Sequence, residues 1–273
     1  MMTNITLGQY YPVDSPVHRL DPRVKIVLTL ALIVCVFLAH SLIGYALIFA
    51  FIFFTARLGK IPFKTVLKGI KPLRFILILT FVLNLFFSTG GNDLIRIGSV
   101  HITDQGLRQS VHYSLRLLFL VMGTSLMTLT TSPIMLSDGM ELLLSPLKKL
   151  HFPAHELAMM MSIALRFIPT LMEEADKIMK AQMARGADFE TGNLLARAKA
   201  MVPLLVPLFV SAFRRAGDLA MAMESRCYHG GEGRTRLRTL KLTKQDAVAC
   251  LLVAGLLLLI ILEGMLLPKG WLL

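Results

Sequence analysis

The sequence predicts an all-α, polytopic membrane protein with about five transmembrane helices and a cytoplasmic helical coupling domain. Hydrophobic residues make up 55% of the 273-residue chain, and its mean hydropathy of +0.66 is too high for an ordinary soluble domain. Five apolar stretches approach the length of about 20 residues that a helix needs to cross lipid. The long segment between the fourth and fifth stretches instead has the periodicity of amphipathic helices.

The expected spans follow a polar amino-terminal segment, 1–23, which contains Pro12, Asp14 and Asp21 and does not resemble a cleavable signal peptide. Four spans are expected within 24–131, and a last span with a short tail within 247–273. The individual spans are 24–39, 42–56, 72–88, 111–131 and 247–267. The first two are short for a hydrocarbon core of about 30 Å, so flanking residues are expected to extend these helices.

The distribution of basic residues predicts the orientation of the chain. The loop 57–74 carries six lysines and arginines without an acidic residue, and the segment 132–246 carries sixteen. The loop 90–110 has two basic residues, balanced by two aspartates. The positive-inside rule therefore puts the amino terminus and the 132–246 segment in the cytoplasm. Topology and contact with an anionic lipid bilayer then explain the net charge of +12, and no nucleic-acid partner is expected.

Two long helices are expected within the cytoplasmic segment. The first covers about 153–185 and the second about 191–226, and the prolines inside both are expected to bend them. Eleven of the sixteen methionines of the chain lie in this segment. Methionine adapts to different partners but also fills cores, and both interpretations stay open for most of these residues. Met183, Met221 and Met223 are the stronger interface candidates, because they lie near the helix ends.

Each long helix ends on an arginine in a similar local sequence. The first end is Ala184-Arg185-Gly186, and the second is Ser225-Arg226-Cys227. A basic residue at such a position can simply favour the helix dipole, with glycine as the left-handed stop. Alternatively, the planar guanidinium can dock into a groove of a soluble partner and pair with carboxylates there. Two such ends suit a partner that is itself a pair of similar subunits.

These motifs resemble those of the transmembrane T components of energy-coupling factor (ECF) transporters, the EcfT/CbiQ family. The resemblance covers nearly the whole chain, with several motifs in the same order. They are His18–Lys25, Leu165–Pro169, Glu173–Ala175, Ala181–Gly186, Phe213–Ala216 and Ala222–Tyr228. The second arginine motif departs from the family pattern, since Ser225 and Cys227 replace alanine and glycine while Arg226 is kept.

The resemblance implies a non-catalytic subunit of an ABC importer in a prokaryotic cell membrane. In this family the arginines of the two motifs dock into two ATP-binding-cassette ATPase subunits, which implies this role for Arg185 and Arg226. ATP binding by these partners moves the coupling helices beneath a membrane-embedded S component, which topples and releases a vitamin or metal inside the cell. The sequence 229–236 resembles the group II version, in which one module serves several S components.

Motifs of other functions are missing from the sequence. Without a GxxxxGK[ST] phosphate-binding sequence, ATP is expected to bind only to partner subunits, and no cofactor is expected in this chain. His151 and His155 have the spacing of metal ligands, but Pro153 intervenes and no third ligand is near, so no metal site is expected. No catalytic cluster is present for a membrane enzyme.

A self-contained secondary carrier or channel is the main alternative. Such a protein requires polar groups or broken helices at the bilayer midplane. Asn84 is expected instead to form a hydrogen bond between helices, and Glu263 to extend toward the membrane surface. The empty midplane argues against this alternative.

Overall fold

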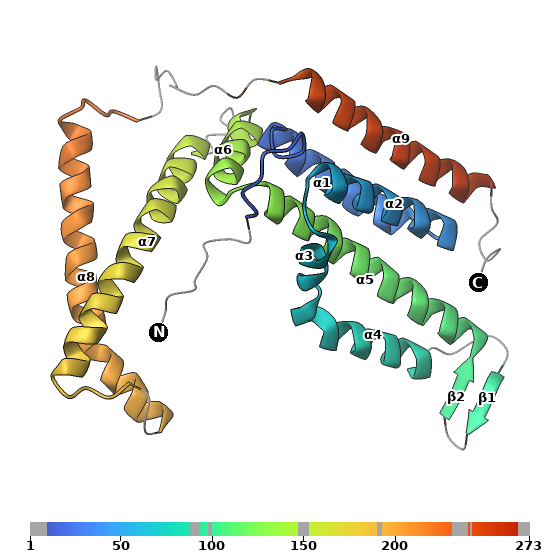
Figure 1. Ribbon diagram of the computed structural model, residues 1–273, viewed down its shortest axis with the longest axis horizontal. Coiled ribbons are helices and arrows are strands. Elements are labelled where there is room, and N and C mark those ends of the chain that lie inside the picture. Colours follow the sequence, from blue (N-terminus) through green and yellow to red (C-terminus); the bar gives the residue numbers. More distant parts are fainter. Residues whose placement is uncertain are drawn as a thin grey trace. The chain divides into compact units, whose positions relative to one another are not determined.

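The computed structural model describes residues 10–87, 93–97, 100–146, 153–189, 193–230, 240 and 242–266. Its regular elements are helices with one β-hairpin (Figure 1). The helices are α1 (Pro22–Leu38), α2 (Leu42–Leu58), α3 (Phe63–Lys68), the 3-10 helix η1 (Lys71–Leu73), α4 (Arg74–Phe87), α5 (Asp104–Thr130), α6 (Pro133–Leu144), α7 (Ala154–Ala184), α8 (Leu194–Glu224) and α9 (Lys244–Leu266). The prediction of an α-helical membrane protein is confirmed.

The hairpin, which pairs β1 (Asp93–Ile97) with β2 (Val100–Thr103) in antiparallel register, differs from the purely helical prediction. Both strands are rich in β-branched residues, and Gly98 and Ser99 separate them in the sequence. Strands of five and four residues are inconspicuous beside apolar stretches of about 20 residues, so hydropathy alone does not reveal them.

The chain forms two compact units. The larger unit contains α1 to α5, the hairpin and α9, and the smaller one contains α7 and α8. The boundary between the units falls between Gly139 and Met140, within α6.

Helices occupy all five predicted span positions, with somewhat different bounds. α1 and α2 have seventeen residues each, or about 26 Å, so flanking residues lengthen these short helices little. α5 begins at Asp104, well before its predicted start. Four described helical stretches are long and apolar enough to cross a membrane, and α2 is a shorter apolar helix. The four are Phe63–Phe87, Asp104–Thr130, Lys199–Glu224 and Lys244–Leu266.

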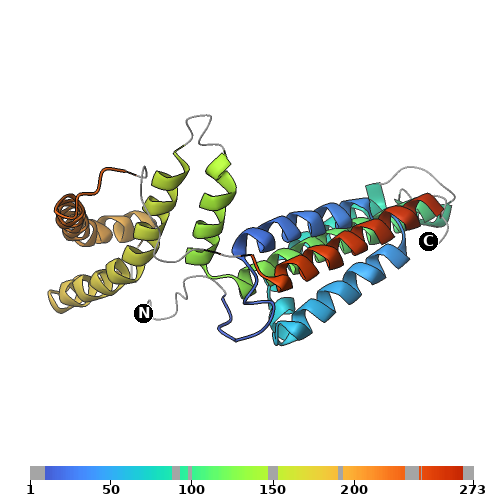
Figure 2. The ribbon, with the colours of Figure 1, turned by 90° about the horizontal axis from the view of Figure 1, so that it is seen from above.

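The larger unit is a bundle in which α1, α2, α5 and α9 surround an apolar core, and α9 lies along α1 (Figure 2). Its fully buried side chains include Val36 of α1, Tyr45 and Ile48 of α2, Met122 of α5 and Ile260 of α9.

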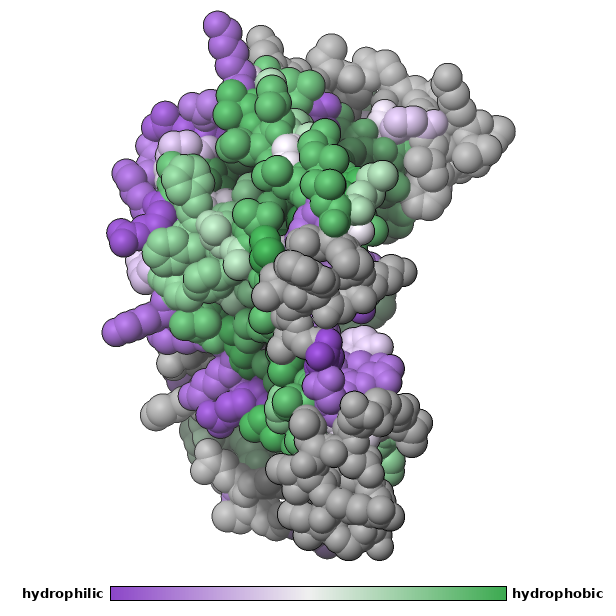
Figure 3. Space-filling model, turned by 90° about the vertical axis from the view of Figure 1, so that its right-hand side faces the viewer, coloured by the Kyte–Doolittle hydropathy of each residue, from purple (hydrophilic) through white to green (hydrophobic). Residues whose placement is uncertain are grey.

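The outside of this bundle is also apolar. Phe75, Phe87, Leu251 and Met265 are each more than 70% exposed, and apolar residues form much of the surface seen in Figure 3. Contact with lipid explains such a surface, because a soluble monomer rarely exposes large apolar patches.

A buried polar cluster joins the starts of α1 and α9 to the end of α5. The carboxylate of Asp246 accepts hydrogen bonds from the backbone N–H of Asp21 (2.8 Å) and of Thr243 (2.6 Å). One side chain thus caps the starts of two helices. The Nζ of Lys25 donates to the carbonyl oxygen of Thr130, the last residue of α5, at 2.9 Å.

The segment before α1 is held by His18. Its Nε2 donates to the carbonyl oxygen of Tyr11 (3.0 Å), and its Nδ1 accepts from the hydroxyl of Ser15 (2.7 Å). Lys25 donates in turn to the carbonyl oxygen of His18 (3.1 Å). Burial lowers the pKa of His18, which favours the neutral ring that these two hydrogen bonds require.

Two polar residues of the predicted spans, Glu263 and Asn84, form hydrogen bonds that were not predicted. Glu263 does more than extend toward the membrane surface, since its Oε1 accepts a hydrogen bond from the N–H of Gly44 (3.0 Å) at the start of α2. The prediction for Asn84 is wrong. Its Nδ2 donates to the carbonyl oxygen of Thr80, one turn earlier in the same helix, at 2.8 Å.

Candidate functional site

α7 and α8, of thirty-one residues each, run in opposite directions and cross (Figure 1). Where they meet, Glu174 accepts hydrogen bonds from the hydroxyl of Ser211 (2.5 Å) and from Nη2 of Arg215 (2.9 Å). These hydrogen bonds, that of Ser211 foremost, hold the pKa of Glu174 below its usual range. Two of the sequence motifs, 173–175 and 213–216, therefore meet through an ion pair that their positions in the sequence did not indicate.

α7 ends in a Schellman motif with Arg185 as its cap residue. The N–H of Gly186 bonds to the carbonyl oxygen of Met183 and the N–H of Ala187 to that of Gln182, both at 3.0 Å. Gly186 has a φ of +88°, in the left-handed region that favours glycine. The predicted glycine stop is therefore present.

α8 ends with the same pair of hydrogen bonds. The N–H of Cys227 bonds to the carbonyl oxygen of Glu224 (2.8 Å), and the N–H of Tyr228 bonds to that of Met223 (3.1 Å). Cys227 has a φ of +56°, so a cysteine occupies the left-handed position that glycine fills in the first motif. The departure from the family sequence leaves the stop geometry intact, with backbone strain of about 1–2 kcal/mol at this residue.

The equivalence of the two ends extends to their arginines. Relative to the two hydrogen bonds that close each helix end, Arg226 occupies the same position as Arg185, directly before the residue in the left-handed region. Both residues are exposed, as are Ala184 and Ser225 beside them. Neither arginine side chain has a hydrogen bond or ion pair with another residue of the described ranges. Both guanidinium groups are therefore available to an external partner.

The carboxyl-terminal ends of α7 and α8, which carry Arg185 and Arg226, lie on opposite sides of the helix crossing (Figure 1). Eleven residues separate Glu174 from Arg185, and fifteen separate Ser211 from Arg226. At 1.5 Å per residue these arms are roughly 17 and 23 Å long. Such a spacing suits two separate protein contacts better than one shared groove.

The faces of both helices retain much exposed apolar surface. None of the α8 residues whose side chains the structure describes is buried, and Phe209, Val210 and Phe213 are between 61% and 75% exposed. Met183 is 49% and Met221 72% exposed, whereas Met223 is half-buried. For Met183 and Met221, this exposure favours a role on the surface over packing in a protein core.

His155 is engaged within the smaller unit. Its Nδ1 lies 2.9 Å from Oε1 of Glu141, and this contact connects α6 with α7. His151, the other histidine of the pair noted in the sequence, lies outside the described residues.

Comparison with known proteins identifies the family. Residues 14–237 match the family model CbiQ, a cobalt transport protein. Three similar proteins are the energy-coupling factor transporter transmembrane proteins EcfT of Thermosediminibacter oceani, Clostridium kluyveri and Bacillus subtilis, with 57%, 54% and 52% identity. The matches cover 94%, 92% and 94% of this chain and 96%, 93% and 98% of those proteins.

The chain belongs to the EcfT/CbiQ family. It is a transmembrane, non-catalytic component of an energy-coupling factor transporter, as its motifs implied.

In this EcfT/CbiQ chain the amino-terminal motif, His18–Lys25, has a structural role. It supplies Asp21 and Lys25 to the buried cluster and starts α1 with an aspartate cap followed by Pro22. Aspartate before proline is a recognisable helix-start signal. The contact of this motif with α9 had no comparable signal, because the partner Asp246 is 225 residues away.

Proposed function

We propose that this EcfT/CbiQ chain couples ATP binding and hydrolysis by two ATPase subunits to the movement of a membrane-embedded S component that takes up a vitamin or other micronutrient. The observation that carries the proposal is the pair of equivalent helix ends, each with an exposed arginine that pairs with no other residue of the described ranges. Arg185 engages one ATP-binding-cassette subunit and Arg226 the other, through carboxylates of the ATPases.

The proposed topology has the amino terminus and the 132–246 segment in the cytoplasm. The buried cluster supports it, because the starts of α1 and α9 and the end of α5 share one face of the bundle. Both ends of the intervening segment then lie on that face. If the apolar stretch Lys199–Glu224 of α8 alone crossed the membrane, the chain would reach the start of α9 on the opposite side from the end of α5. A second crossing, by α7, is disfavoured because α7 carries charged residues. The basic residues of the segment assign this face to the cytoplasm.

The proposed mechanism requires firm anchors and an adaptable surface. Closure of the ATPase pair on ATP moves the two arginine ends, and the helices transmit this motion because each is continuous over thirty-one residues. The exposed apolar faces of α7 and α8, including Met183 and Met221, contact the S component. Contacts of this kind can shift without breaking specific hydrogen bonds, which suits a subunit that exchanges S components in a shared, group II module.

Charge reversal of the arginines tests the docking role. Arg185→Glu and Arg226→Glu should each weaken co-purification of the ATPase subunits in mild detergent, and the double variant should abolish it together with uptake, because like charges then face each other. Lys180→Glu is the matched control, since Lys180 is an exposed cation of α7 about one turn before its end. Wild-type assembly by the double variant would refute docking through these residues.

A further inference from the structure

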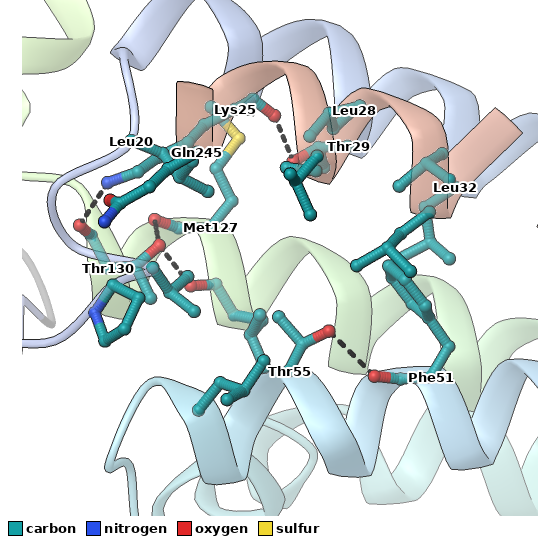
Figure 4. Close-up of a pocket in the computed structure, with 18 of the residues that line it drawn as sticks. Leu20, Lys25, Leu28, Thr29, Leu32, Phe51, Thr55, Met127, Thr130 and Gln245 are labelled. Atoms are coloured by element: carbon teal, nitrogen blue, oxygen red, sulfur yellow. Dashed lines mark hydrogen bonds between the residues drawn. The ribbon is translucent and has the colours of Figure 1, made fainter. Parts of the chain in front are cut away.

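The membrane bundle contains a partly open cavity of about 400 Å³ (Figure 4). Its wall is formed by α1, α2, α5, α9 and the segment before α1. Leu28 and Leu32 of α1, Phe51 of α2 and Met127 of α5 contribute apolar side chains to it. The cavity therefore lies among helices that contact lipid on their outer faces.

The buried polar groups of this cavity are satisfied within the protein. The hydroxyls of Thr29, Thr55 and Thr130 donate to backbone carbonyls one turn earlier in their own helices. The Nζ of Lys25 donates to the carbonyl oxygens of His18 and Thr130. Because these groups are already paired, the cavity suits hydrocarbon and would bind a polar solute poorly.

The polar side chains at the start of α9 are placed differently. Lys244 and Gln245 line the cavity but are exposed, and neither pairs with another residue of the described part of the chain. They begin α9 on the face where α1 also begins, which is the cytoplasmic membrane surface in the proposed topology. A lysine at the membrane surface attracts the phosphate of an anionic lipid.

We propose that the cavity holds an acyl chain of one anionic phospholipid of the inner leaflet, with its phosphate beside Lys244. The choice of leaflet rests on the proposed topology. Along α1 the lining extends from Lys25 to Leu32, about 10 Å, which lies within one leaflet of a hydrocarbon core about 30 Å thick. The lipid fills a space between helices that none of the described side chains occupies.

Native mass spectrometry of the full chain, extracted from nanodiscs of equal phosphatidylglycerol and phosphatidylethanolamine, tests this proposal. The wild type should retain one phosphatidylglycerol. Ala249→Phe, on the cavity wall, should reduce its occupancy about tenfold. Ala254→Phe is the matched control on the same helix, because Ala254 is exposed and does not line the cavity, and it should retain the lipid. Lys244→Gln should reduce the preference for the anionic lipid about fivefold.

Several results would overturn the proposal. They are no retained lipid in the wild type, full retention in Ala249→Phe, equal loss in Ala254→Phe, and an unchanged lipid preference in Lys244→Gln. Displacement of the lipid when the complete transporter assembles would identify the cavity as a protein contact. Val248→Phe, from an exposed lining residue, replaces Ala249→Phe if that variant does not fold. Lipid retention is measured without the ATPases, so its failure leaves the arginine docking test unaffected.

Discussion

Cys227 and Gly186 perform the same task with different backbone energies. Both stop a long helix in the left-handed region, at φ values of +56° and +88°. A Cβ atom on Gly186 would meet no atom within 4 Å, so any effect of substitution there comes from the backbone conformation alone. The two positions thus form a matched pair in which only the conformational preference of the residue differs.

Exchanging these two residues should change the two helix ends in opposite directions. Cys227→Gly should stabilise the end of α8 by about 1 kcal/mol, and Gly186→Cys should destabilise the end of α7 by a similar amount. Hydrogen exchange at the amides of Tyr228 and Ala187, which close the two motifs, measures each effect locally. Slower exchange at Tyr228 and faster exchange at Ala187 are expected, and changes of the same sign at both would contradict the assigned strain.

At the scale of elements, the crossing of α7 and α8 depends on Glu174. Because the folded-state pKa of this carboxyl is lowered, its stabilising effect is present above its unfolded pKa of about 4.3 and is lost as pH falls through the folded value. Glu174→Gln should therefore lower the melting temperature at pH 7, and the difference from wild type should shrink as the pH falls below about 4. The neighbouring, exposed Glu173→Gln is the control, and an equal effect of both substitutions would argue against the crossing contact.

Element positions were predictable wherever lipid contact determines composition. Hydropathy placed a predicted span on each of α1, α2, α4, α5 and α9, but it placed the start of α5 too late, because the first turns of α5 are polar and include Asp104 and Arg108. The prolines of the two long helices were predicted to bend these helices, and α7 continues through Pro169 without ending there. α8 continues through its two prolines and is visibly bent in its first half (Figure 1).

At the scale of the whole chain, Asp246 connects the segment before α1 to the start of α9. Asp246→Ala would leave the buried N–H group of Asp21 and the part-buried N–H group of Thr243 without their acceptor, which should destabilise the bundle by about 1–3 kcal/mol. Thermal unfolding in detergent measures the loss. Asp104→Ala is the control. The side chains of Asp104 and Arg108 are both exposed, so their ion pair should contribute less than about 1 kcal/mol. An equal effect of the two variants would contradict the role of the cluster.

Long-range pairings were the part that the sequence could not supply. The arginine motifs were recognisable because each is contiguous and ends a helix. The contacts of Glu174 with Arg215, and of Asp246 with Asp21, depend on how helices pack after the chain has folded. Neither pair has a local pattern, since 41 and 225 residues separate their members.

The point where α7 and α8 cross acts as a pivot that is closer to one arginine than to the other. It lies about 17 Å from Arg185 and about 23 Å from Arg226. Equal displacements of the two arginine-bearing helix ends would rotate α7 about the crossing point through an angle about a third larger than that of α8. Because the two arginines end different helices on opposite sides of the crossing, equal movements of both would tilt the two helices by unequal angles and so give the tilt a direction.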